Sequence, residues 1–214
     1  NLYQTYINIA NTALKDSGVD VEFNVVHKEE IDYEELEEED AILDAFDRFR
    51  DGSDELSKEI ADLKKQYKPD LVSLVVSTQF GKRWDVLRRD GFIRGRADKP
   101  VSLPEGLLYS VINVAAEANV FLEMGDYVLA HELGHNFGCH HDRDNAKSGK
   151  PIYDYGYGYQ FQVIGPRGDK VDCRTIMCYQ RHYMDYRLGY FSNPDIKYLN
   201  VPTGVKEGQS DSAN

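Results

Sequence analysis

The segment from His131 to His141 reads HELGHNFGCHH and carries residues that suit a metal ion. His131 and His135 are four residues apart, so on a helix both imidazoles project from one face, a turn apart. Two imidazole nitrogens can then reach one zinc ion at about 2.0–2.1 Å. Glu132 follows the first histidine, where its carboxylate can take a proton from water on the metal. The pattern predicts a metal centre that activates water.

Gly138 indicates how a third ligand enters. Glycine tolerates the left-handed conformation that ends many helices, so the chain can turn back there and bring His141 to the ion. Three protein ligands leave a fourth position for water, as in catalytic zinc sites. His140 competes for this position and Cys139 is a ligand in principle; the extended spacing favours His141 and a structural role for the cysteine.

The short HExxH pattern alone also arises as a chance pair of surface or core histidines, and the added Gly138 and His141 argue against that interpretation. With Met177 inside Thr175–Tyr179, the segment resembles the metzincin clan of zinc metalloproteases, whose members share a methionine turn under the zinc site. Asp142, directly after the third histidine, is similar to the adamalysin or reprolysin branch.

The resemblance implies a zinc-dependent endopeptidase that hydrolyses peptide bonds of proteins through a zinc-activated water, with Glu132 as general base. It assigns Met177 to an apolar floor under the imidazoles and Asp142 to anchoring the turn near the third ligand. Tyr179 stands two residues after the methionine, where the astacin and serralysin branches place a tyrosine that reaches zinc. A packed loop tyrosine is the alternative in a chain with 15 tyrosines.

The resemblance implies a metzincin-like α+β fold: a twisted mixed sheet with long helices in an N-terminal lobe, an active-site helix, and a small, loop-rich C-terminal lobe. The hydrophobic patterns supply the individual elements. Helices are predicted over residues 2–16, about 40–50, 54–67 and 126–137, and strands over 19–26, 71–77 and 108–114. We expect one catalytic domain, with residues 1–138 as the first lobe and 139–214 as the lobe with the third histidine and the methionine turn.

Two features depart from the usual pattern. Metzincins place a strand before the first long helix, whereas this chain begins at that helix, so we expect a missing or trimmed strand. Venom and disintegrin proteases also carry more cysteines than Cys139, Cys173 and Cys178. For these three, one disulfide and one free thiol is the simplest expectation, with full reduction or zinc ligation as alternatives and the pairing left open.

Net charge is −12, from 37 acidic and 25 basic residues, which argues against a nucleic-acid binder. No apolar run approaches the roughly 18–20 residues that span a bilayer, so we expect a soluble protein. The resemblance implies a secreted monomer. The acidity suits solubility, with local calcium binding as the minor alternative. Seven basic residues within residues 80–100 form either a solvated surface or a substrate-facing loop that favours acidic side chains.

The clan also implies that polypeptide substrates bind in extended form along an exposed sheet edge, for which Leu108–Val114 is the candidate. The loop Gln180–Tyr190 is expected to wall the pocket after the scissile bond, although no side chain in it dictates a preference. Two rival functions remain: a non-proteolytic zinc-binding domain, against which the intact Glu132 argues, and an interaction protein that assembles through its acidic surface and Tyr153–Tyr159.

Overall fold

The computed structural model describes residues 2–32, 41–51, 55–76, 95–98, 108–113, 127–146, 149–181, 185–209 and 213. Its helices are α1 (Leu2–Asp16), α2 (Ala41–Asp51), α3 (Glu55–Tyr67) and α5 (Val128–Asn136). Its strands are β1 (Leu71–Val76), β2 (Gly95–Ala97), β3 (Leu108–Asn113), β4 (Gln160–Ile164), β5 (Lys170–Arg174), β6 (Tyr186–Arg187), β7 (Lys197–Tyr198) and β8 (Val201–Pro202). The α+β class is confirmed, as are the four predicted helices and the strands at β1 and β3. No helix in these ranges is long and apolar enough to cross a membrane.

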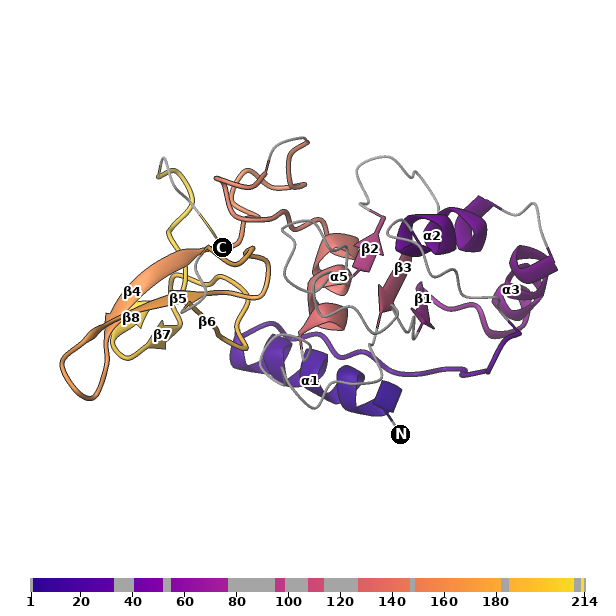
Figure 1. The fold of residues 1–214 in the computed structure, drawn as a ribbon, viewed down its shortest axis with the longest axis horizontal. Helices are drawn as coiled ribbons and strands as arrows, with labels where there is room; N and C mark the ends of the chain where they lie inside the picture. The colour runs from indigo at the N-terminus through magenta and orange to yellow at the C-terminus, as the bar shows by residue number, and fades with distance from the viewer. Residues whose placement is uncertain are drawn as a thin grey trace.

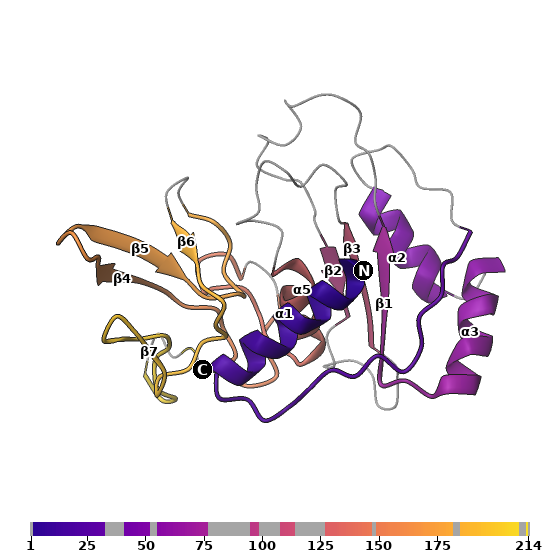
Figure 2. The same cartoon turned by 90° about the horizontal axis from the view of Figure 1, so that it is seen from below.

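Helix α5, which carries the histidine motif, lies between two groups of strands. In Figure 1, β1–β3 with α2 and α3 occupy one end of the molecule, β4–β8 occupy the other, and α5 lies between them. Figure 2 shows α1 running alongside α5, beside the first sheet. The helix that carries the histidine motif is therefore placed where both ends of the molecule can contribute to one site.

The first sheet has the order β1-β3-β2, which corrects the predicted substrate edge. Leu108–Val114 was expected to be exposed, but β3 pairs in parallel with β1 on one side and antiparallel with β2 on the other. Its backbone groups are thus already hydrogen-bonded within the sheet. In the described part of the sheet, the edge next to α5 is β2.

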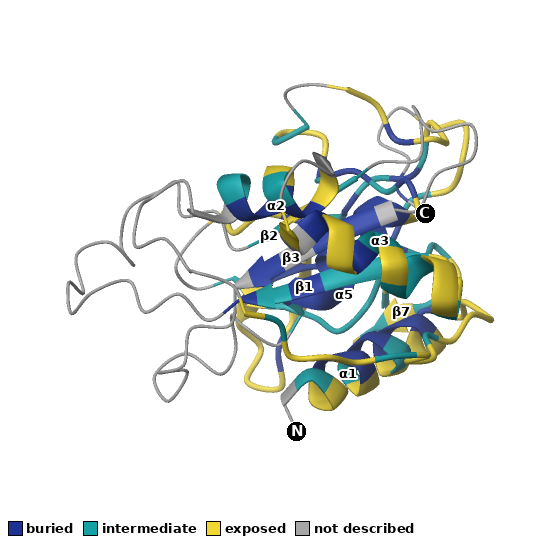
Figure 3. Ribbon diagram, turned by 90° about the vertical axis from the view of Figure 1, so that its right-hand side faces the viewer, coloured by how far each residue is buried: buried dark blue, intermediate teal, exposed yellow. Residues whose placement is uncertain are grey.

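Opposite faces of β3 contribute to two separate cores. Tyr109 packs with α2, α3 and β1, whereas Ile112, on the other face, packs with α1 and α5. In Figure 3 the side of α1 toward the sheet is buried and its outer side is exposed. The second core also contains Ile176 and Met177, so it joins α5 to the C-terminal part of the chain.

The strand predicted over residues 19–26 is wrong. This segment has no strand pairing, and Val21 and Val26 are 47% and 59% exposed. The Asn11 side chain makes the two backbone hydrogen bonds to Phe23 that a neighbouring strand would otherwise make. Its Nδ2 donates to the Phe23 carbonyl at 3.0 Å, and its Oδ1 accepts from the Phe23 N–H at 2.8 Å. The alternation of apolar residues over 19–26 did not predict burial, because within this segment only Phe23 packs against the core.

The C-terminal region holds strands that the sequence analysis treated as loops. β4 and β5 form an antiparallel hairpin in register from Gln160↔Arg174 to Ile164↔Lys170, and β6 pairs in parallel with β5. Phe161 and Val163 are buried while the residues after each are exposed. This period of two, followed by a glycine-containing turn, was the signal that could have predicted the hairpin.

The structure does not contain the predicted disulfide: Cys139, Cys173 and Cys178 are all free thiols. Cys139 packs beside the core that contains α5, whereas Cys173 belongs to the small core of the β4–β5 hairpin. Of the basic residues within 80–100, only Arg96 lies in the described ranges, so the predicted loop is otherwise outside them.

Candidate metal centre

Helix α5 ends in the left-handed turn that its glycine predicts. Gly138 has a φ of +87° and donates its N–H to the His135 carbonyl at 2.9 Å. The Cys139 N–H reaches back to the Gly134 carbonyl at 3.0 Å. This pair of bonds is a Schellman motif, which satisfies the last carbonyls of the helix and reverses the chain. The reversal returns His141 toward the helix.

Three imidazoles converge as a result. One nitrogen from each of His131, His135 and His141 lies within 4.8 Å of the other two, and this is the only such group of three potential ligands among the described residues. The Nε2 atoms of His135 and His141 are 3.0 Å apart. His140 is buried outside this trio, and its Nδ1 accepts the N–H of His141.

The two helical histidines are oriented by backbone carbonyls. His131 Nδ1 lies 2.9 Å from the Ile176 carbonyl, and His135 Nδ1 lies 2.9 Å from the Cys139 carbonyl. Because a carbonyl only accepts, each Nδ1 carries the proton and each Nε2 keeps its lone pair for a metal. Burial, followed by the neighbouring His135, holds the pKa of His131 well below its usual value, which favours the neutral ligand form.

The donor set therefore fits zinc. Three imidazole nitrogens within 4.8 Å of one another match a catalytic zinc site, which takes three protein ligands and leaves one position open. Two nitrogen lone pairs at 3.0 Å repel each other unless a proton or a cation lies between them. No second group of acidic or other ligands suits a metal in the described ranges, so the expectation of calcium is not supported.

The methionine turn packs directly under α5. Met177 is 1% exposed, and an added Cβ at Gly134 would lie 2.5 Å from its sulfur and 2.9 Å from the Phe191 ring. Gly134 therefore lets the methionine approach the helix backbone between the two histidines. The sequence analysis missed this residue, although a glycine inside a helix, which costs about 1 kcal/mol relative to alanine, was a signal of close packing.

Asp142 and Tyr179 connect the third histidine to the end of the methionine turn. The buried Asp142 carboxylate accepts the Tyr179 N–H at 3.1 Å and both of its oxygens accept the Asn145 side-chain amide. The Tyr179 ring centroid lies 4.0 Å from that of His141 and 6.4 Å from that of His131. Burial raises the pKa of Tyr179, so its hydroxyl keeps its proton near neutral pH.

Glu132 is buried beside the edge strand. Burial raises the pKa of its carboxyl to about 8, against the opposing charges of Arg187 and Arg96. An added Cβ at Gly95 would lie 2.5 Å from Glu132 Oε1, so β2 approaches the carboxylate as closely as its backbone allows. The sequence analysis missed Gly95, because its contact with the motif crosses a long stretch of chain.

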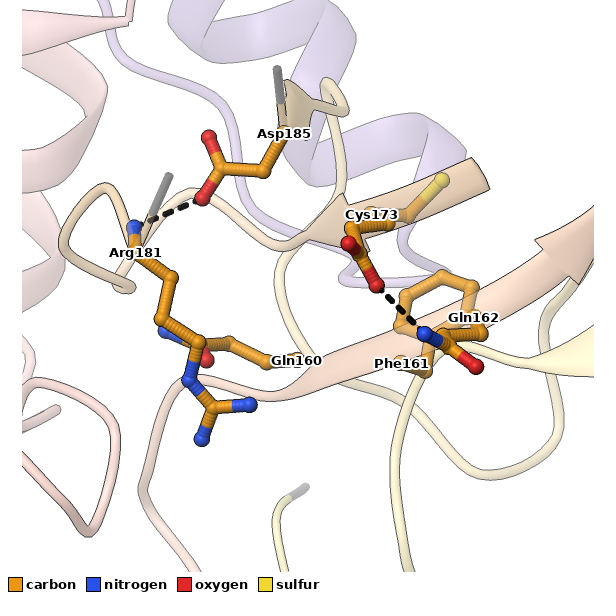
Figure 4. A pocket seen from close by; sticks show the side chains of 7 residues that line it. Gln160, Phe161, Gln162, Cys173, Arg181 and Asp185 are labelled. Atoms are coloured by element: carbon orange, nitrogen blue, oxygen red, sulfur yellow. Dashed lines mark hydrogen bonds between the residues drawn. The ribbon is translucent and has the colours of Figure 1, made fainter. Parts of the chain in front are cut away.

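A separate small pocket lies on the β4–β5 hairpin. Figure 4 shows Gln160, Phe161, Gln162, Cys173, Arg181 and Asp185 around it. None of the three imidazoles lines this pocket, and polar groups around it bond to one another, as in the 2.8 Å bond from Gln162 to Asp172. The chemistry therefore lies at the imidazoles rather than here.

Two family models match the chain. One, described as metallo-peptidase family M12B, reprolysin-like, covers residues 2–142, and a second with the same description covers residues 101–206. A peptidyl-Asp metalloendopeptidase of Pseudomonas aeruginosa is 29% identical over 214 residues, 95% of this chain and 33% of the relative. One of Stenotrophomonas maltophilia is 42% identical over 82 residues, 38% of this chain and 18% of the relative. The chain thus spans a third or less of these relatives. No solved structure matches it.

Proposed function

Because the chain belongs to the reprolysin-like metallopeptidases of family M12B, we propose that it is a zinc-dependent endopeptidase with Glu132 as its general base. The observation that supports this proposal is the convergence of three buried or half-buried imidazoles next to one buried carboxylate. We further propose that it acts as a secreted monomer, as the metzincin resemblance implies, and as one catalytic domain with lobes at residues 1–138 and 139–214.

In the proposed mechanism the protein positions water and moves its protons. His131, His135 and His141 would hold the zinc ion, which would supply Lewis acidity to the attacking water. Glu132 takes the proton of the attacking water and delivers it to the leaving amine. Burial raises the pKa of this carboxyl, which makes the carboxylate a stronger base than an exposed one. The Tyr179 hydroxyl donates to the scissile carbonyl oxygen as negative charge develops there.

We propose that the substrate lies extended along β2. The strand pairs with β3 on one side, no described strand pairs with its other side, and Gly95 brings its backbone next to Glu132. A peptide that adds to this edge gains main-chain hydrogen bonds while its scissile bond lies near the carboxylate. We therefore still propose that the substrate binds in extended form, but along the sheet edge formed by β2 instead of the edge predicted at Leu108–Val114.

The relatives carry the name peptidyl-Asp metalloendopeptidase, and on this ground we propose that the chain cleaves next to an aspartate. Two cations, Arg187 and Arg96, lower the pKa of Glu132 against its burial, so positive potential reaches this carboxyl. Such a potential favours an acidic substrate side chain.

Casein zymography of the 214-residue chain, with and without a chelator, tests the proposed function. We expect a cleared band that the chelator abolishes and added zinc restores. Zinc by elemental analysis without any cleavage would favour the non-proteolytic zinc-binding domain. Absence of both zinc and cleavage would favour the interaction protein.

A further inference from the structure

Asn136 lies on the same face of α5 as Glu132, about one turn further along the helix. The residue is buried, with only 1% of its surface exposed. Its Nδ2 group donates to two backbone carbonyls, that of Asp98 at 2.9 Å and that of Tyr109 at 3.1 Å. Tyr109 belongs to β3 and Asp98 directly follows β2, so one side-chain amide joins α5 to two neighbouring strands.

The amide bonds to a carbonyl that the sheet leaves unpaired. Asp98 lies opposite Tyr109, and a complete antiparallel pair at such a position exchanges two backbone hydrogen bonds. Here the Asp98 N–H donates to the Tyr109 carbonyl at 2.9 Å, whereas the Tyr109 N–H donates to the Asp98 carboxylate at 3.3 Å. The Asp98 carbonyl accepts from Asn136 instead. Asn136 therefore fastens the end of β2 to the helix.

The other end of β2 meets Glu132. The strand lies next to α5 in Figure 1, and an added Cβ at Gly95 would lie 2.5 Å from Glu132 Oε1 and 2.7 Å from its Cγ. This contact sets how closely the strand can approach the helix, and the bond from Asn136 holds it there three residues further along. The position of the carboxylate relative to the edge strand is thus fixed at two points.

Packing alone does not account for an amide at position 136. Both partners of Nδ2 are carbonyls, which only accept, so the NH₂ group faces the strands and Oδ1 faces away from them. In the described part of the chain, Oδ1 is buried with no hydrogen-bond partner. An unsatisfied buried acceptor costs stability, and an apolar side chain such as leucine would avoid that cost. What the amide adds is its pair of bonds to the strands.

We propose that Asn136 is a positioning residue of the peptidase, which holds β2 against α5 so that a substrate extended along this strand meets Glu132 in register. This inference rests on the proposed function and on the substrate path along β2. Asn136 does not touch the substrate; it acts through the Asp98 carbonyl. A side chain with a purely structural role would change stability without changing how kcat/KM depends on substrate length.

Two peptides that share one scissile bond test this dependence. Mass spectrometry identifies a bond that the 214-residue chain cleaves in casein. The long peptide extends several residues to either side of that bond, and the short peptide keeps only the residues next to it, with blocked ends. We expect the unmodified protein to have the higher kcat/KM on the long peptide, because only that peptide gains main-chain hydrogen bonds along β2. Asn136→Leu should reduce the long/short ratio by about 3- to 10-fold, the equivalent of one such bond.

Asn11→Leu is the matched control. The Asn11 amide also bonds to the backbone of an extended segment, through the Phe23 carbonyl at 3.0 Å and the Phe23 N–H at 2.8 Å, but this segment is not the substrate edge. We expect this variant to lose stability and to keep the long/short ratio. Thermal unfolding and zinc content report whether each variant is folded. Asn136→Ala, which removes the amide without adding bulk, takes the place of Asn136→Leu if the leucine prevents folding.

Amide hydrogen exchange of zinc-stripped protein measures the strand directly. In the proteolytic peptide that contains β2, exchange should be about 3- to 10-fold faster in Asn136→Leu than in the unmodified protein, because the strand opens more easily without its bond to α5. The same peptide should exchange at the unmodified rate in Asn11→Leu. Unchanged exchange in the Asn136 variant would mean that the amide does not hold the strand, which overturns the inference without any measurement of activity.

The outcomes of the peptide assay separate the two proposals. If the unmodified protein cleaves no casein bond, the proposed peptidase function fails and this inference fails with it. If it cleaves the long and short peptides with equal kcat/KM, the function stands, but the substrate path along β2 and the role of Asn136 are both wrong. If it prefers the long peptide and the folded Asn136 variants keep the ratio, or Asn11→Leu lowers the ratio equally, only the role of Asn136 is overturned.

Discussion

Helix α5 and the methionine turn meet at the same imidazoles but are held in different ways. In α5, the histidine spacing and the Schellman motif at Gly138 involve residues within about two helical turns of one another. In the turn, Thr175 bonds to Tyr159, Ile176 bonds to Tyr190, and Met177 packs under Gly134. One half of the metal site is built from local contacts and the other from contacts between distant parts of the chain.

The difference explains which half a sequence pattern can predict. A helix with a glycine cap needs only its own residues, so the motif predicts its geometry directly. The turn has no periodicity of its own and takes its shape from β4, β5 and the segment after β6. Local and distant contacts should therefore respond differently to mutation, and five changes test this from the largest expected effect to the smallest.

The first change removes the proposed chemistry and leaves both halves in place. Glu132→Gln is nearly isosteric but cannot accept a proton, so we expect casein cleavage to fall by about 10²- to 10⁴-fold while zinc content stays the same. Activity assays and elemental analysis of the same preparation provide the check. Cleavage at the parental rate would remove Glu132 from the mechanism.

The second change removes the ligand that the glycine turn brings back. Loss of a residue that merely orients a ligand costs about 10- to 100-fold in metal affinity, so His141→Ala should cost at least that much. The matched control is His140→Ala, whose imidazole lies outside the trio. Zinc retained equally by both variants after dialysis against a weak chelator would exclude His141 from the ligand set.

The third change concerns the burial of Glu132 in zinc-free protein. Burial raises the pKa of this carboxyl from its ordinary 4.5 to about 8 in the folded chain, so between these values the unfolded chain loses a proton that the folded chain keeps. Folding stability should then fall as pH rises through this window, by about 3 kcal/mol from pH 5.5 to 8.5.

Urea unfolding of zinc-stripped protein at several pH values measures this loss. Glu132→Gln has no proton to lose at this position, so its stability relative to the parent should increase as pH rises. A difference between the two proteins that stays constant from pH 5.5 to 8.5 would mean that Glu132 is not desolvated as the structure indicates.

Much of the fold could be predicted because its elements carry their own periodicity. Helices α1, α2, α3 and α5 match the predicted ranges within a few residues. The strand predicted over residues 19–26 failed because alternating valines satisfy the same pattern when they are exposed on an unpaired segment. Burial on one face, which defines a strand, depends on a neighbour that the local sequence does not contain.

The site was predictable to the same extent. The motif predicted His131, His135 and His141 as ligands with Glu132 as the base, and the structure brings the three imidazoles within 4.8 Å of one another. Gly95 approaches Glu132 from β2, 37 residues earlier in the sequence. No local pattern marks such a residue, since only the pairing of β2 with β3 decides that it lies next to the motif.

The fourth change tests the local half. Gly138→Ala places a Cβ about 2.4 Å from Ile152 and strains a φ of +87°. Together these should cost about 2–4 kcal/mol of stability. Gly168→Ala is the matched control: its φ is +81° with nothing within 4 Å of the new Cβ, so it should cost only about 1–2 kcal/mol. Equal costs in urea unfolding would show that the contact with Ile152 does not constrain the turn.

The last change tests the contact that joins the halves. Gly134→Ala gains about 1 kcal/mol of helix propensity, but its Cβ would overlap the Met177 sulfur, so we expect a net loss of about 1–2 kcal/mol. Met177→Ala alone should cost about 2–5 kcal/mol by leaving a cavity. In the double variant the alanine methyl occupies part of that cavity. The sum of the stability losses of the two single variants should therefore exceed the loss measured for the double variant by at least about 1 kcal/mol. Urea unfolding of the zinc-stripped proteins excludes metal affinity from the comparison, and strictly additive costs would mean that α5 and the methionine turn are held independently.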